Sequence, residues 1–161
     1  MSTAQFTKDF EGKRVVVERV FVAPREKVWH AWTVSEELDK WWGPKPWNAV
    51  THSHSFSVGG RWRYYMAGPQ GEKEWCGLTY TAIDVGNSFS GEDYFSDADG
   101  VPRADMPVMK WRVEFSDVPE GTKVVVTTDF ASEADMRKIT DMGFEQGFSQ
   151  GLDQLATLVE G

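Results

Sequence analysis

The chain has 161 residues, with 17 lysines and arginines against 25 aspartates and glutamates, so its formal net charge is −8. This length can form one domain with a buried core, and we expect a single domain over residues 1–161. The acidic balance argues against nucleic acid and anionic membrane surfaces as partners. Cys76 is the single cysteine, which excludes an internal disulfide and favours a reducing compartment. The first residues are polar, without a signal-peptide or membrane-span pattern, so we expect a cytoplasmic protein.

The N-terminal third combines one strand with two short helices. We interpret residues 1–13 as a flexible arm. Residues 14–22 are rich in β-branched side chains and alternate between two faces, with Val15, Val17, Arg19 and Phe21 on one of them, which predicts a strand. Pro24 then suits the first turn of a helix, and Ser35 with the acids that follow it opens a second, shorter helix. Glycine and proline at 43–44 end that helix.

From Trp47 onward the apolar residues recur with period two, and glycine-rich turns separate the repeats. The predicted strands are 48–57, 61–67, 74–84, 88–95, 107–116 and 122–130. The acidic loop 96–106 is expected to be mobile. Strands joined by such short connections pair as antiparallel neighbours.

The last segment is predicted to be one long helix over residues 133–159, since it lacks proline and has apolar residues at helical spacing. The apolar stripe comprises Phe144, Phe148, Leu152, Leu155 and Val159. Gly143, Gly147 and Gly151 recur every fourth residue beside it. Each helical glycine costs roughly 1 kcal/mol against alanine, so the row indicates either a close backbone approach or room left beside the helix.

The order strand, two short helices, six strands and long helix predicts an α+β fold in which the final helix packs into the concave face of a curved antiparallel sheet. A cavity remains between helix and sheet unless large side chains fill it. Aromatic residues alternate on one face of the successive strands, and a small-ligand pocket has such an apolar lining with a few polar groups. We expect roughly half of these aromatic side chains to be plain core instead.

These patterns give a candidate set of cavity-lining residues. The set is Trp42, Trp62, Tyr64, Met66, Leu78, Tyr80, Phe95, Trp111, Val113, Gly143, Gly147, Phe148 and Gly151. The glycines are expected to thin the helix where it passes over Trp62, Tyr64 and Trp111. The loop from Trp41 to Pro44 either gates one end of the cavity or plugs the space between the small helices and the sheet.

Several runs resemble the AHSA-type branch of the START-like superfamily, named for activators of the heat-shock protein 90 ATPase, which has the helix-grip fold. The matching runs are Val22-Ala23-Pro24-Arg25-Glu26-Lys27-Val28-Trp29, Leu38-Asp39-Lys40-Trp41-Trp42-Gly43-Pro44, Val58-Gly59-Gly60-Arg61-Trp62-Arg63 with Met66 and Gly71, Gly121-Thr122, and Gly147-Phe148 with Leu152 and Leu155. The resemblance spans nearly the whole chain in the family's order. It implies a hydrophobic small-molecule pocket.

The chain departs from the family pattern at three positions. Ser55 and Ser57 replace an acid and a base before the double glycine, and Phe148 follows Gly147 where tryptophan is usual. Contacts that depend on those groups are therefore not carried over. True activators of the chaperone also have an N-terminal domain that contacts it, for which this chain has no room, so a chaperone role is the weaker implication.

Metal and nucleophile chemistry receive little support from the sequence. His52 and His54 are two apart on a strand and are expected to share a face, as a zinc or copper pair would, but a third ligand is not evident and we interpret them as solvent-facing. Cys76 is interpreted as a small buried residue. No phosphate-binding loop or nucleophile elbow occurs, so neither a catalytic signature, a metal nor a cofactor is predicted.

Carboxylates offer the main route to catalysis. Asp93, if it faced the cavity, would have a raised pKa and could act as a general acid or base. The leading hypothesis is thus a binder of a hydrophobic or aromatic small molecule, lipid-like or polyketide-like. The alternatives are a cyclase or dehydratase that uses Asp93, Glu114 or Tyr80, and a chaperone-associated module of the stress response. A homodimer stays open.

Overall fold

The computed structural model describes residues 3–161, which form eight strands and four helices. The strands are β1 (Gln5–Asp9), β2 (Arg14–Phe21), β3 (Asn48–His54), β4 (Arg61–Ala67), β5 (Lys73–Asp84), β6 (Ser88–Phe95), β7 (Met109–Val118) and β8 (Gly121–Phe130). The helices are α1 (Arg25–Thr33), α2 (Ser35–Trp41), α3 (Glu133–Asp141) and α4 (Phe144–Glu160). All strands belong to one antiparallel sheet in the order β1-β2-β8-β7-β6-β5-β4-β3. The predicted α+β helix-grip fold is confirmed.

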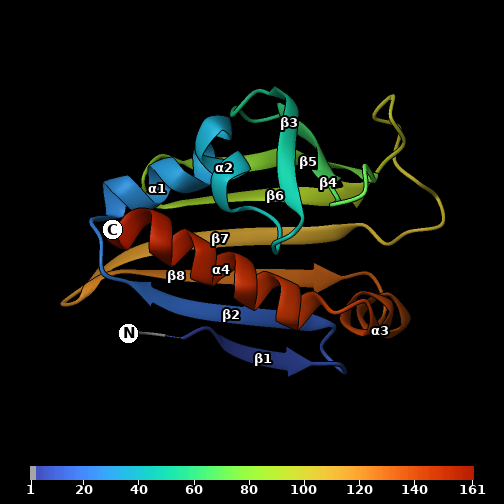
Figure 1. Ribbon diagram of the computed structural model, residues 1–161. Helices are drawn as coiled ribbons and strands as arrows, with labels where there is room; N and C mark the ends of the chain where they lie inside the picture. Colours follow the sequence, from blue (N-terminus) through green and yellow to red (C-terminus); the bar gives the residue numbers. More distant parts are fainter. Residues whose placement is uncertain (1–2) are drawn as a thin grey trace.

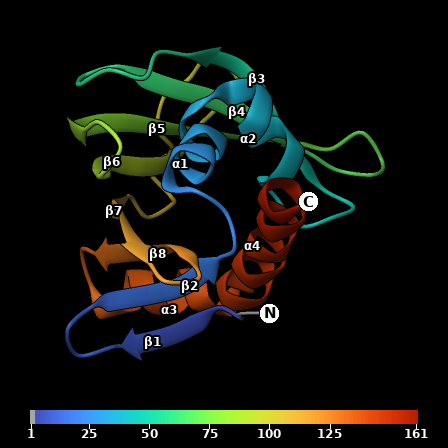
Figure 2. The same cartoon turned by 90° about the vertical axis from the view of Figure 1, so that its left-hand side faces the viewer.

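The sheet is bent into a trough, and three helices lie on its inner side (Figures 1 and 2). In Figure 2 the strands follow a curve from β3 to β1, with α1, α2 and α4 inside it. Two bulges, after Thr51 in β3 and after Tyr80 in β5, contribute to this bending. Among the helices in residues 3–161, none is both long and apolar enough to span a bilayer.

The predicted flexible arm was wrong for residues 5–9, which form the edge strand β1. Its residues pair with β2, with Phe6 opposite Val17. The sequence signal is weak because Phe6 is the only apolar residue in this strand. Its ring meets that of Phe144 edge-on, with centroids 6.5 Å apart, so β1 is fixed to the start of α4.

The predicted single long helix was also wrong, since it is two helices joined at Met142 and Gly143. Gly143 has a φ of 90°, a left-handed conformation that favours glycine and ends α3. Its N–H donates a hydrogen bond to the carbonyl of Thr140 (3.1 Å). Gly143 therefore belongs to a turn, and only Gly147 and Gly151 lie within α4.

The trough is filled solidly at the α1 end. The indole of Trp29 meets the rings of Phe56, Phe89 and Phe115 at centroid distances of 5.8, 6.0 and 5.1 Å. Aromatic pairs in such edge-on contact combine large buried area with a preferred geometry. This end supplies packing, and it leaves the space near the α3–α4 turn as the place for a cavity.

Candidate functional site

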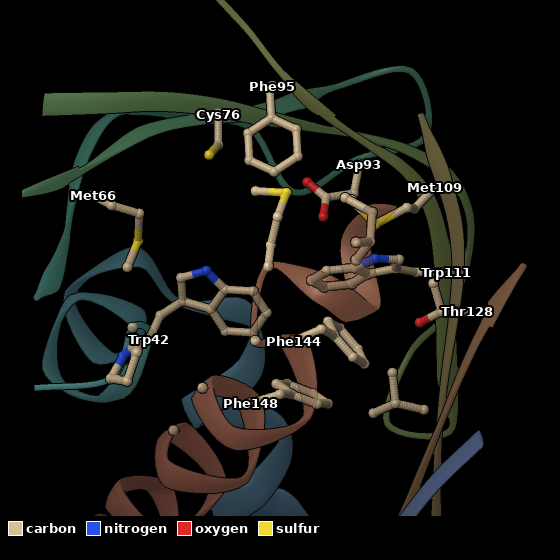
Figure 3. Close-up of a pocket in the computed structure, with 18 of the residues that line it drawn as sticks. Trp42, Met66, Cys76, Asp93, Phe95, Met109, Trp111, Thr128, Phe144 and Phe148 are labelled. Atoms are coloured by element: carbon tan, nitrogen blue, oxygen red, sulfur yellow. The ribbon is translucent and has the colours of Figure 1, made fainter. Parts of the chain in front are cut away.

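A cavity of about 270 Å³ lies beneath the first half of α4, between the α3–α4 turn, the loop after α2 and the inner face of strands β4 to β8 (Figure 3). Its walls are mainly tryptophan, phenylalanine and methionine side chains. Small-molecule pockets span roughly 300–1,000 Å³, so the volume suits a compact molecule better than a long acyl chain.

Most of the predicted lining residues meet at this cavity. Those that line it are Trp42, Tyr64, Met66, Phe95, Trp111, Gly143, Gly147, Phe148 and Gly151. Those that do not are Trp62, Leu78, Tyr80 and Val113, each no more than 2% exposed. These four lie on the predicted inner faces, but neighbouring side chains cover them: Tyr80 packs against Phe56 and Phe89, and Trp62 stacks on Tyr64. Alternation gives the face of a strand; it does not give the position along the trough.

Sequence reasoning missed further lining residues. These are Trp41, Gly43, Pro44, Cys76, Met109, Val126, Thr128, Ile139, Met142 and Phe144, besides Asp93, which was considered only as a catalytic candidate. The strand residues among them could have been found from register, because Cys76 pairs with Tyr64 and Met109 with Asp93. Ile139 and Met142 could not, since they reach the cavity through the unforeseen turn at Gly143.

Trp41, the last residue of α2, and Trp42, the first residue of the loop that follows, have different surroundings. Trp41 is 1% exposed, and its Nε1–H donates to the carbonyl of Ala31 (2.8 Å), which matches the plug interpretation. Trp42 forms part of the cavity wall. Its ring lies 5.2 Å from that of Trp111 and 6.0 Å from that of Phe148. A gating motion of this loop stays a prediction.

Helix α4 is fixed against this loop by Gln154. Its Nε2–H donates to the carbonyls of Trp41 (2.9 Å) and Gly43 (2.8 Å), and its Oε1 accepts from the N–H of Lys45 (3.0 Å). Backbone carbonyls and amides that helices cannot pair are thereby satisfied by one side chain.

The two helical glycines face the same loop. A methyl group on Gly147 would meet Cγ of Pro44 at 3.5 Å, and one on Gly151 would meet the carbonyl oxygen of Trp41 at 3.8 Å. Both are ordinary contacts. The glycines thus border the cavity and the loop; the expectation that they pass over Trp62, Tyr64 and Trp111 was wrong, because the loop lies between.

Asp93 is the ionisable group of greatest interest. Figure 3 shows its carboxyl group pointing into the cavity beside Phe95 and Met109. Part of the side chain is accessible because it borders the cavity, yet protein surrounds it on the other sides. Burial raises its pKa from 3.8 to about 8, opposed by a hydrogen bond from the backbone of Tyr94. Among the lining residues in 3–161 there is no lysine, arginine or histidine.

The other ionisable groups in the cavity stay neutral at physiological pH. Burial raises the pKa of the Cys76 thiol to about 12 and that of the Tyr64 phenol well above its usual value. Cys76 is 7% exposed and forms no disulfide, so its interpretation as a small buried residue is confirmed. At neutral pH the cavity holds one carboxyl group that is near its own titration point.

The remaining catalytic candidates do not reach the cavity. Glu114 lies on the outer face, where Arg112 is 3.5 Å away. Tyr80 is buried, its hydroxyl is 2.8 Å from Nε2 of His54, and burial raises its pKa. Asp93 is therefore the one candidate of the three that could act on a bound molecule.

The expected shared face of His52 and His54 was wrong. The bulge after Thr51 adds a residue to β3 and breaks the alternation. The His52 ring lies against Trp75 (5.6 Å between centroids) and the His54 ring against Tyr80 (5.8 Å), so the two histidines point to opposite faces. In the part of the chain that the structure describes, no three His, Cys, Asp or Glu side chains gather as a metal site.

Comparison with known families gives one clear match. The family model "Activator of Hsp90 ATPase homolog 1-like protein" matches residues 22–160, which contain every helix and all strands but β1 and β2. A search of curated proteins gave no significant match.

Solved structures are similar over nearly the whole chain. A protein from Arthrobacter aurescens has 30% identity and a TM-score of 0.92, covering 97% of this chain and 91% of its own. Protein Ms6760 from Mycobacterium smegmatis has 31% identity and a TM-score of 0.90, covering 99% and 97%. The AHSA1 protein SPO3351 from Silicibacter pomeroyi, at 20% identity, TM-score 0.68 and coverage of 91% and 97%, shares the fold.

Proposed function

Since the chain belongs to the Activator of Hsp90 ATPase homolog 1-like family within the START-like fold group, we propose that it binds a compact hydrophobic or aromatic molecule in the cavity under α4. The observation that carries this proposal is the cavity itself, about 270 Å³ lined by aromatic and methionine side chains with few polar groups. Ligand sites have this composition, in which apolar walls supply affinity and a few polar groups fix orientation.

The unfilled space supports the proposal because protein interiors are otherwise close-packed. The same trough is packed solidly around Trp29, so this chain has the side chains needed to fill its interior. An apolar molecule that covers the cavity walls removes their surface from water, which contributes roughly 25 cal/mol per Å² of apolar area.

A ligand screen with a pocket-filling variant tests the proposal. Native mass spectrometry and thermal shift against compact aromatic compounds should find ligands for the wild type. Gly147→Leu, which adds a side chain at the cavity wall beside Pro44, should abolish binding while the domain stays folded. Gln146→Leu is the matched control, because Gln146 is exposed on the same helix, and it should bind as the wild type does.

The comparison of Gly147→Leu with the wild type can overturn the proposal. Equal binding by Gly147→Leu and the wild type would show that the ligand sits elsewhere and overturn the proposal. If Gly147→Leu does not fold, Cys76→Met fills the cavity from the sheet side instead, and the same comparison applies.

Proton transfer is a second candidate function, supported by Asp93. A carboxyl group with a pKa of about 8 exchanges its proton near neutral pH, as a general acid or base must. The test uses any molecule that the screen finds to bind. A cyclase or dehydratase would convert it, and Asp93→Asn would bind it without conversion; recovery of the unchanged molecule from the wild type excludes this candidate.

A further inference from the structure

Asp93 places one acidic group in a cavity that, among the described residues, is lined by no basic side chain. Its neighbours along the sheet are Leu78 on β5 and Met109 on β7, and Phe95 lies beside it (Figure 3). A buried carboxylate needs a cation or several hydrogen-bond donors beside it. Without them its pKa rises and the group is protonated instead. Within residues 3–161, no lysine, arginine or histidine that lines the cavity is available to an ionised Asp93.

The opposite wall of the cavity consists of aromatic rings. Phe144 and Phe148 are stacked with centroids 5.6 Å apart, and the Trp42 ring lies 6.0 Å from that of Phe148. Trp42 also lies 5.2 Å from Trp111, which extends the aromatic surface onto β7 of the sheet. Figure 3 shows Trp42, Phe144 and Phe148 on the helix side and Asp93 on the sheet side. Aromatic faces attract organic cations by about 0.5–2 kcal/mol each, and groups of such rings recognise quaternary ammonium ions.

We propose that the natural ligand of this cavity is a compact organic cation, an alkyl- or arylammonium compound, whose charged nitrogen pairs with Asp93 while its apolar groups lie against Trp42, Trp111 and Phe148. The inference rests on the proposed function and adds the chemical class of the ligand. A neutral molecule of the same shape gains the apolar contacts without the ion pair.

Binding of such a cation is linked to the proton on Asp93. With a pKa of about 8, Asp93 is mostly protonated at pH 7, so the cation displaces close to one proton on binding. The other titratable groups facing this part of the cavity, Cys76 from β5 and Tyr64 from β4, have raised pKa values and stay neutral. Glu74 and Arg103 act electrostatically on Cys76 from outside the lining. The residues of α3 and α4 that line the cavity are not ionisable, and Glu145, next to Phe144, pairs with Lys8 instead.

The experiment compares phenyltrimethylammonium with its uncharged isostere tert-butylbenzene by isothermal titration calorimetry. The cation should bind more tightly as pH rises, by about fifty-fold between pH 6 and pH 8, because apparent affinity follows the ionised fraction of Asp93. Calorimetry in buffers of different ionisation enthalpy should show about one proton released at pH 7. Asp93→Asn should weaken cation binding by about tenfold or more and remove its pH dependence, and the isostere should bind both proteins alike.

Each result discriminates. Binding of tert-butylbenzene in preference to the cation, or a cation affinity that ignores Asp93→Asn, overturns the ligand class and leaves the hydrophobic pocket intact. Absence of binding by both probes, together with no ligand in the wider screen, removes the proposed function as well. Cation binding that weakens with rising pH also contradicts the inference, because such binding would depend on protonated Asp93, whereas the proposed ion pair needs the ionised carboxylate.

Discussion

The indole Nε1–H of Trp42 donates a hydrogen bond to the hydroxyl oxygen of Tyr64, 3.1 Å away. This bond joins the loop after α2 to strand β4 across the floor of the trough. It fixes the Trp42 ring in the position where it contacts both Trp111 and Phe148. The shape of the cavity therefore depends on a polar contact between two aromatic residues.

Trp42→Phe should destabilise the protein by about 1–3 kcal/mol, because it removes buried ring area and leaves the Tyr64 hydroxyl without this donor. Urea unfolding measures the change. Tyr64→Phe removes the same hydrogen bond by deleting its acceptor. The double variant should therefore lose less free energy of unfolding than the two single variants lose together, with a coupling energy of about 0.5–1.5 kcal/mol. Strict additivity would show that the bond adds nothing.

Alanine at the two neighbouring glycines should have opposite effects. Gly143 has a φ of 90°, and Gly143→Ala should cost about 1–2 kcal/mol because an L-residue is strained in that conformation. Gly147 is helical, and the added methyl meets Pro44 at an ordinary 3.5 Å, so Gly147→Ala should gain up to about 1 kcal/mol from helix propensity. Thermal unfolding checks both, and a gain for Gly143→Ala would contradict the turn geometry.

Asp93→Asn should change how stability depends on pH. The pKa of Asp93 is higher in the folded chain, about 8, than its ordinary 3.8. Between these two values the folded state binds a proton that the unfolded state has released. The contribution of protonated Asp93 to the free energy of unfolding is therefore complete below about pH 4 and decreases as pH rises to 8. Relative to Asp93→Asn, the wild type should lose up to roughly 1.4 kcal/mol per pH unit in this window. Denaturant unfolding at several pH values measures the difference, and parallel curves would show that Asp93 titrates normally.

Gln154→Leu should destabilise the protein by about 1–3 kcal/mol, since the carbonyls of Trp41 and Gly43 lose their donor. Gln150 is the matched control on the same helix. It is exposed and makes a single 3.1 Å bond to the carbonyl of Lys45, so Gln150→Leu should change stability by about 0.5 kcal/mol or less. Chemical unfolding of the two variants gives the comparison, and equal losses would refute the special role of Gln154.

The sequence predicted the fold well where periodicity is strong. The strand beginning at Arg14 and the helix beginning near Pro24 were found within about two residues, because alternation and proline are local signals. The edge strand β1 was missed because its partner strand, and one contact from Phe6 to Phe144, stabilise it. Contacts between distant segments are not encoded in local periodicity.

The candidate site was predicted in part, for similar reasons. Alternation placed Tyr64 and Trp111 on the inner face together with Trp62 and Val113, although only the first two line the cavity. Where along the trough the space remains depends on the turn at Gly143, a conformation that glycine permits but does not require. The bulge that separates His52 from His54 was equally invisible in the residue pattern.

Three predictions from sequence and resemblance have measurements of their own. A chaperone contact would show as stimulation of the Hsp90 ATPase by the purified chain. Sedimentation velocity distinguishes a monomer from a homodimer. Fractionation of cells that express the tagged protein tests the expected cytoplasmic location.

The division of the trough into a solid end and a hollow end also bears on how this family diversifies. Substitutions around Trp29 act on the free energy of unfolding alone, whereas substitutions around Asp93 and Trp111 act on the free energy of unfolding and, under the proposed function, on which molecule the hollow end binds. A change of ligand is therefore coupled to a change of stability at that end only. Two chains that share about 30% of their residues and superpose closely, as this one and its Arthrobacter relative do, are free to recognise chemically different molecules.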